Sequence, residues 1–423
     1  MFGRIHCHAG IGALCSALGL LTPATGARAH GEPPTAHAVV REDAEGPLLV
    51  KLGIGFAARE EPGRFRYLCP ALWAGEYTAP AAALPDGTVV IGADSGLMLL
   101  APDGTLTRHP DPLAEGFSTE LVVSHGGVFA LRFKQGKSEV LAVDAVKARV
   151  VWSDSRVWYS LAPLAHGLVL LRSQNALLDQ LTLSFEGALL DSQQASSPRS
   201  VDYVFARGLA EEAYALLLSQ SSPELGRIQG NTFTRVALAA SSIAGPIITP
   251  QGALLAVDGQ LQRLDGASLS PLADPTYVGC LERHEHGSYA CTREGVSRLG
   301  PEGVGEQLFS LAWLVPPDFS QLSDEKARAR CDYQWQDLRF DLLALGVTLD
   351  LEDEFAADAG RGDEFDAGVG EDEADASEEP PASAKSSSRC ALRPAASAEA
   401  PWSWGLLGLG LCGLALRRRR QRR

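Results

Sequence analysis

Short apolar segments, each about as long as a β-strand, follow one another along most of the chain. Between residues 45 and 315, runs rich in Val, Leu, Phe and Tyr alternate with clusters of Gly, Asp, Pro and Ser. Few stretches in this region repeat their apolar residues with the helical period. This pattern is typical of an all-β sandwich, barrel or propeller.

A repeat distinguishes among these folds. A small residue or turn followed by an apolar strand recurs at steps of 41, 40, 40, 45, 40 and 35 residues, starting at Gly46, Gly87, Gly127, Gly167, Glu212, Gly252 and Gly287. About 40 residues accommodate one four-stranded blade. The repeat therefore predicts an all-β, seven-bladed β-propeller over residues 30–315. Six blades, eight blades or a pair of β-sandwiches remain alternatives.

Strands and helices can also be predicted locally. Within one unit, the pattern predicts strands at Gly127–Phe133, Glu139–Asp144 and Arg149–Ser153. Residues 316–349 depart from the blade pattern. There, Ser323–Arg330 begins with Ser, has acidic residues in its first turn and ends in basic ones, which predicts a short helix. Asp337–Leu345 is expected to form another helical turn, and the whole segment a cap against the closing blade.

The N-terminus is typical of a signal peptide. Arg4 supplies a positive charge, Ile11–Leu21 is apolar but too short to span a bilayer, and Ala27–Ala29 is a small-x-small cleavage site. Cleavage between Ala29 and His30 would release a mature chain beginning at residue 30. A buried N-terminal helix is the alternative interpretation.

The C-terminus combines a charged linker with an apolar segment. Residues 350–379 contain 14 Asp and Glu against a single Arg, and the linker 350–389 is expected to be disordered, with loose ion binding as an alternative. Trp402–Leu416 is apolar and precedes a cluster of arginines (Arg417, Arg418, Arg419 and Arg420). Basic residues stay on the cytoplasmic side of a membrane. The pattern therefore predicts a C-terminal hydrophobic helix in the inner membrane; a plain tail anchor and a basic tail that binds acidic partners are alternatives.

The order of linker, Cys390, apolar helix and arginines resembles the MYXO-CTERM sorting signals of myxobacterial surface proteins. This resemblance covers residues 390–423 and implies sorting machinery as a partner, Cys390 as the processing position and removal of the helix during export. The body resembles a group of secreted myxobacterial propeller proteins of unknown activity. It shares with them His30-Gly31, the Phe65–Cys69 strand and a closing segment, Leu314–Trp335, that contains a cysteine.

Four cysteines remain in the body once the signal, Cys390 and the terminal helix are set aside: Cys69, Cys280, Cys291 and Cys331. An even number in an exported domain indicates disulfides, and four cysteines allow three pairings. Cys280 and Cys291 flank a polar hairpin and can face each other. Cys69 and Cys331 would then join the two ends of the ring. A zinc site built from Cys280, His284, His286 and Cys291 is the alternative, although its spacing matches no recognised motif.

No catalytic or cofactor motif is found in the sequence. It lacks G-x-S-x-G, P-loop and dinucleotide fingerprints, and His284-Glu285-His286 lacks metalloprotease spacing and is expected to be a solvated hairpin tip. Copper binding by an N-terminal His30 together with His37 is a minor alternative. The net charge of -15 argues against nucleic acid as a partner. We therefore expect no cofactor, no metal and no catalytic residue.

These observations predict an exported propeller at the cell surface or outer membrane of a Gram-negative bacterium, or released from it. We expect a non-catalytic binding or scaffold module for a protein or glycan ligand, bound at loops on one face or in the centre of the ring. The alternative is a secreted hydrolase or lyase acting on glycans at the centre. A quinone or metal oxidoreductase is a third alternative. Val140–Trp152 resembles one PQQ-type repeat, but it occurs only once, so it supports a propeller blade and not a quinone cofactor. Acidic residues converging with an Arg or Tyr at the centre would favour the enzyme, and scattered neutral residues the binding module.

Overall fold

The part of the chain that the computed structural model describes contains seven β-sheets, antiparallel except for one parallel pair of strands at the edge of the first sheet. That part comprises residues 35–73, 79–198, 201–219, 222–250, 252–266, 268–322 and 324–349. The predicted signal peptide with its Ala29–His30 cleavage site, the acidic linker, and the sorting signal with Cys390 and its arginines lie outside the described residues.

The first three sheets, blades 1 to 3, follow the chain in order. Blade 1 contains β1 (Ala36–Asp43), β2 (Gly46–Leu52), β3 (Phe56–Glu61), β4 (Arg64–Leu68) and, added at its edge, β29 (Leu314–Val315). Blade 2 contains β5 (Ala81–Ala83), β6 (Val89–Ala93), β7 (Gly96–Leu100) and β8 (Leu106–Arg108). Blade 3 contains β9 (Phe117–Ser124), β10 (Gly127–Lys134), β11 (Lys137–Val143) and β12 (Ala148–Asp154).

Blades 4 to 7 repeat the same four-stranded plan. Blade 4 contains β13 (Ser160–Leu164), β14 (Gly167–Gln174), β15 (Leu177–Leu183) and β16 (Leu189–Ser196), and blade 5 contains β17 (Tyr203–Leu209), β18 (Glu212–Leu218), β19 (Glu224–Gln229) and β20 (Thr232–Leu238). Blade 6 contains β21 (Ile243–Thr249), β22 (Gly252–Val257), β23 (Gln260–Asp265) and β24 (Ser268–Pro271). Blade 7 contains β25 (Cys280–Arg283), β26 (Ser288–Cys291), β27 (Gly295–Gly300) and β28 (Gly303–Ser310).

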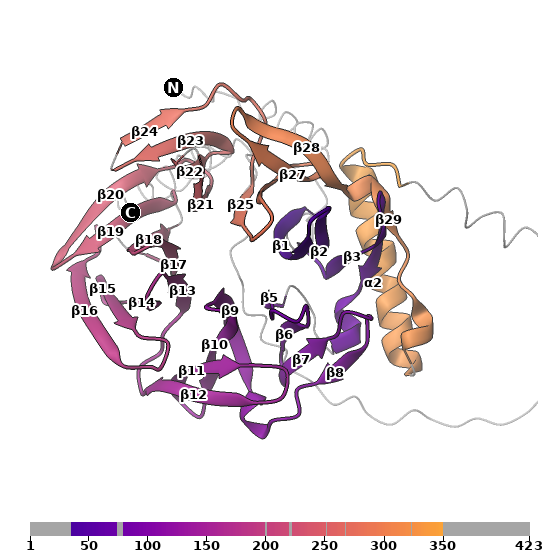
Figure 1. Cartoon of the computed structure of the whole chain (residues 1–423), viewed down its shortest axis with the longest axis horizontal. Helices are drawn as coiled ribbons and strands as arrows, with labels where there is room; N and C mark the ends of the chain where they lie inside the picture. The colour runs from indigo at the N-terminus through magenta and orange to yellow at the C-terminus, as the bar shows by residue number, and fades with distance from the viewer. Residues whose placement is uncertain are drawn as a thin grey trace, which may run out of the picture.

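The sheets stand around a common axis, with the first strand of each blade innermost (Figure 1). The chain is therefore a seven-bladed β-propeller, as the repeat predicts. The repeated apolar segments are the second strands, which are packed between neighbouring blades and are the most apolar; in β14, Leu168 to Leu171 are completely buried. The three strands predicted inside one unit are also confirmed, as β10, β11 and β12.

The C-terminal segment closes the ring on blade 1. After β28, the chain forms a 3-10 turn, η3 (Leu311–Trp313), and then β29, which pairs in parallel with β4 so that Leu314 lies opposite Phe65. Two further 3-10 turns, η1 (Pro70–Trp73) and η4 (Phe319–Gln321), flank this junction. Because β29 follows blade 7 in sequence but joins blade 1 in space, it fastens the last blade to the first.

A single helix, α2 (Glu325–Ala344), packs on the outside of this junction, as Figure 1 shows. The two helical segments predicted at Ser323–Arg330 and Asp337–Leu345 are parts of one continuous helix. The buried positions Cys331, Trp335, Leu338 and Leu342 recur at helical spacing through the segment that connects them, so one continuous stripe faces the core. The helix begins after Asp324, whose carboxylate accepts a hydrogen bond from the Lys326 amide at 3.1 Å.

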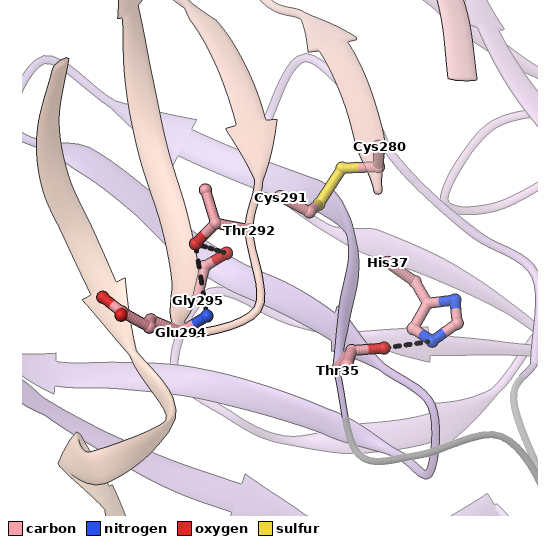
Figure 2. Close-up of a disulfide and its surroundings, with 7 residues drawn as sticks. All are labelled: Thr35, His37, Cys280, Cys291, Thr292, Glu294 and Gly295. Atoms are coloured by element: carbon pink, nitrogen blue, oxygen red, sulfur yellow. Dashed lines mark hydrogen bonds between the residues drawn. A yellow bond between two sulfur atoms is a disulfide. The ribbon is translucent and has the colours of Figure 1, made fainter. Parts of the chain in front are cut away.

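Two disulfides join the four body cysteines in the predicted pairing. Cys69, directly after β4, is bonded to Cys331 on α2, with a Cα–Cα distance of 5.5 Å. Cys280 and Cys291 face each other on β25 and β26, with a Cα–Cα distance of 4.8 Å (Figure 2). The first disulfide fixes the cap to blade 1, and the second fixes a hairpin within blade 7.

Candidate functional site

The two faces of the ring differ in the chain segments that form them. Since every blade begins at its inner strand, the inner strands run in the same direction around the axis. The connections that lead into them therefore gather on one face, together with the turns between the second and third strands. We call this the entry face. Hydrogen bonds tie the two kinds of segment together: the Val278 amide donates to Gly259 O at 2.8 Å, and Asp258 accepts from the Ala240 and Ser241 amides.

Two carboxyl groups near the axis each lie within electrostatic reach of the same two cationic side chains, and the four residues come from alternate blades. They are Lys51 on blade 1, Glu120 on blade 3, Arg207 on blade 5 and Glu282 on blade 7, and we call them the axis cluster. Both cations act on both carboxyl groups. Going around the ring, the charges alternate in sign, so the cluster combines two anionic and two cationic groups without a net charge.

Glu120 connects three blades through hydrogen bonds. Its carboxylate accepts from the Ser160 hydroxyl at 2.8 Å and from the Leu161 amide at 2.6 Å, both on the neighbouring inner strand. The Ser160 hydroxyl oxygen in turn accepts from the Ala206 amide of blade 5 at 2.8 Å. Burial raises the pKa of Glu120, although Arg207 and the two hydrogen bonds oppose this shift. Through these contacts, the Glu120 carboxylate helps to join blades 3, 4 and 5.

Glu282 is different, because no hydrogen bond or ion pair joins its carboxyl group to another residue in the described part of the chain. Burial among the inner strands raises its pKa from 4.5 to about 7, against the opposing effect of Arg207 and Lys51. The side chain nevertheless keeps part of its surface in solvent. A carboxyl group of this kind can donate or accept a hydrogen bond near neutral pH, and it can exchange a proton with a ligand.

The His284-Glu285-His286 turn is only partly the solvated tip that the sequence predicts. Glu285 and His286 are exposed, and the His286 amide donates to Glu42 of blade 1 at 2.6 Å. The prediction is wrong for His284. Its ring is half-buried beside Tyr289, with 5.8 Å between the ring centres, and burial lowers its pKa. The hairpin packs against the neighbouring blade, which covers one side of the turn.

The zinc alternative is also wrong, because Cys280 and Cys291 are bonded to each other and supply no thiolate ligands. Among the described residues, no group of three or more His, Cys, Asp or Glu side chains is arranged to hold a metal ion. His37, the candidate partner of His30 in a copper site, is hydrogen-bonded to the Thr35 hydroxyl at 3.1 Å (Figure 2). His30 itself is outside the described residues.

The sequence reading missed the axis cluster, although a weak signal was present. The members from Lys51 to Glu282 follow one another at intervals of about two repeat steps. That signal was hidden because the repeat marks the second strands, whereas three of the four charges lie on inner strands. The cluster brings the carboxyl groups of Glu120 and Glu282 near Arg207, and this arrangement was expected to favour an enzyme. However, Glu120 is already held by hydrogen bonds.

No known family model matches the sequence, and no curated protein is significantly similar to it. Many solved structures match the chain. The chain is similar to virginiamycin B lyase from Staphylococcus aureus, at 12% identity over 54% of this chain and 82% of that one, with a TM-score of 0.39. It is similar to PorZ, a surface component of the type IX secretion system of Porphyromonas gingivalis, at 14% identity over 67% and 39% of the two chains, with a TM-score of 0.44.

A third similar structure is the Dos1 propeller, at 10% identity over 63% of this chain and 91% of that one, with a TM-score of 0.42. At these identities and TM-scores, no argument is drawn from the comparisons. Separately, no helix in the described ranges is long and apolar enough to cross a membrane.

Proposed function

We propose that this protein is an exported, surface-anchored propeller that acts as a non-catalytic binding module, with a ligand group bound at the axis cluster. The observation that carries the proposal is the convergence of Lys51, Glu120, Arg207 and Glu282 from four different blades. Buried and half-buried charges are costly unless they are paired or used. Ligand sites commonly lie where separate elements of a fold converge.

The chemistry of the cluster favours a ligand that carries an acidic group. Arg207 and Lys51 can attract a carboxylate, and Arg207 can bind it with two parallel hydrogen bonds. Glu282, when protonated, can donate a further hydrogen bond to the same group. Protein and glycan ligands can both supply such a group, and a uronic-acid polysaccharide is the simplest probe of it.

The test is binding of hexagalacturonate to the purified chain, measured by calorimetry below and above neutral pH. We expect binding that weakens as pH rises through 7, because ionised Glu282 repels the carboxylate. Arg207→Gln should abolish this binding, whereas Arg149→Gln, an exposed arginine on the outermost strand of blade 3, should leave it unchanged. Equal binding by the wild type and Arg207→Gln would contradict a role for the axis cluster.

A second candidate, a glycan hydrolase or lyase working at the centre of the ring, is favoured by one observation. The pKa of Glu282, about 7, suits a general acid or base that works near neutral pH. A hydrolase normally needs two available carboxyl groups, and Glu120 is held by Ser160 and Leu161. A lyase needs only one base beside a cation. Accumulation of unsaturated uronate from polygalacturonate, lost in Glu282→Gln, would establish the enzyme and refute the non-catalytic proposal.

The location is proposed from the two ends of the sequence. Two disulfides in the body suit an oxidising compartment outside the cytoplasm. On the sorting-signal hypothesis, protein at the cell surface should lack Trp402–Arg423, and Cys390→Ala should leave the full-length chain in the inner membrane. Intact-mass measurement of surface-released protein tests this proposal. A released chain that still ends at Arg423 would contradict processing.

A further inference from the structure

Exposed aromatic side chains recur where the chain enters the inner strands. Phe117 is the first residue of β9 and is 49% exposed, Tyr159 directly precedes β13 and is 54% exposed, and Tyr203 is the first residue of β17 and is 41% exposed. Tyr277, in the connection that leads to β25, is 39% exposed. Four of the seven blades thus carry an exposed aromatic ring at nearly the same structural position.

These residues stand at or before the starts of β9, β13, β17 and β25, so they belong to the entry face. Figure 1 shows these four strands around the axis of the ring. The placement of Tyr277 is fixed by contacts. Its ring packs directly on Gly259, where the backbone has a φ of +80° and an added Cβ would come within 2.2 Å of the ring. The Arg293 guanidinium covers the ring at 4.8 Å from its centre.

The core does not require these aromatics. The tyrosines that stabilise the fold, Tyr67, Tyr214 and Tyr289, are almost completely buried. Exposed aromatic groups on a soluble protein commonly mark a binding surface. Recurrence on four blades is difficult to attribute to isolated surface residues, which need no explanation when they occur singly.

The rings are spread over separate blades and do not form one apolar patch, and Tyr277 is covered by Gly259 and Arg293. Phe117 lies opposite the exposed Phe133 in the pairing of β9 with β10. In the described part of the chain, the three tyrosines make no contact with another aromatic ring. Tyr159 and Tyr203 are each close in sequence to an exposed charged residue, Arg156 and Asp202. A protein partner generally prefers a continuous apolar centre. A sugar chain has the opposite pattern, because each ring offers a flat C–H face for stacking and hydroxyl groups at its edge for polar neighbours.

We propose that the entry face binds a polysaccharide chain whose sugar rings stack on Phe117, Tyr159 and Tyr203. This inference rests on the proposed function, for which it names the ligand class. Arg207 lies four residues beyond Tyr203 on the same strand, which is about 13 Å at about 3.3 Å per residue. The axis cluster is therefore within reach of a few sugar units that extend inward from the entry face.

The experiment measures binding of four hexasaccharides to the full chain by calorimetry. Three are neutral (cellohexaose, laminarihexaose and chitohexaose), and the fourth is hexagalacturonate. We expect at least one to bind, with Tyr159→Ala and Tyr203→Ala each raising its Kd about five- to tenfold and Tyr159→Phe preserving it. Tyr333→Ala, an equally exposed aromatic on α2 outside the ring, is the matched control and should not change the Kd.

The outcomes separate this inference from the proposed function. If hexagalacturonate binding is lost in Arg207→Gln but unchanged in both Tyr→Ala variants, the axis cluster binds the ligand and stacking is refuted. If the Tyr→Ala variants weaken binding and Arg207→Gln does not, stacking is supported without the axis cluster. Failure of all four saccharides to bind would overturn the inference.

Discussion

The unusual carboxyl group of Glu282 should make the stability of the ring depend on pH, and Glu282→Gln should remove that dependence. Raising the pKa from 4.5 to about 7 means that the folded state holds the proton more tightly than the unfolded state. The stabilisation is fully present below about pH 4.5 and is lost as pH rises to about 7. At about 1.4 kcal/mol per pH unit, the difference is about 3 kcal/mol. This is an upper value, because the side chain keeps part of its surface in solvent.

The assay is urea unfolding of both proteins, followed by tryptophan fluorescence, from about pH 4 to about pH 8. The free energy of unfolding of Glu282→Gln, relative to the wild type, should increase by up to about 3 kcal/mol over this range. Glu285→Gln, an exposed glutamate on the same hairpin, is the control and should follow the wild-type curve. Parallel curves for the wild type and Glu282→Gln would refute the argument that Glu282 is desolvated in the folded ring.

Two further predictions concern the closure of the ring. Replacing Cys69 and Cys331 by Ser should reduce the free energy of unfolding by about 5 kcal/mol, and replacing Cys280 and Cys291 by Ser should reduce it by about 3 kcal/mol. The difference arises because the first disulfide closes a loop of 262 residues and the second closes one of 11. Urea unfolding measures both losses, and equal losses would contradict loop closure as the cause. Trp335→Ala, which empties the centre of the contact between α2 and blade 1, should cost about 3–5 kcal/mol by the same measurement, and a loss below about 1 kcal/mol would show that the helix is not an integral part of the core.

The blade repeat was readable from the sequence because one strand in each blade has a nearly invariant environment. The second strands lie between two other strands and between two neighbouring blades, so they must be apolar on both faces. The inner strands have only one paired edge and border the axis, so their sequences are free to vary. In β9 four of the eight residues are polar (Ser118, Thr119, Glu120 and Ser124), whereas β21 is mostly apolar. Sequence reading therefore located the blades but not the strands that hold the candidate site.

The charged site could not be predicted for a geometric reason. Lys51 and Glu282 are separated by most of the propeller in sequence, and they approach only because the ring closes. Nothing in the local sequence distinguishes Glu282 from Glu285, three residues later on the same hairpin, although one faces the axis region and the other faces solvent. By contrast, the disulfides were predictable because only three pairings exist for four cysteines and one pair spans a short hairpin.

The closure of the ring and the candidate site depend on each other. Lys51 belongs to blade 1 and Glu282 to blade 7, so the junction between the first and last blades sets the separation of two of the four charges. That junction is held by β29 on β4, by α2 and by the bond between Cys69 and Cys331. Opening it would let the end blades move apart and would expose Glu282 to solvent. A protein with a reduced Cys69–Cys331 bond should then be less stable, and its stability should no longer show the pH dependence expected of Glu282. In this way, the redox state of a distant disulfide would affect the carboxyl group at the axis.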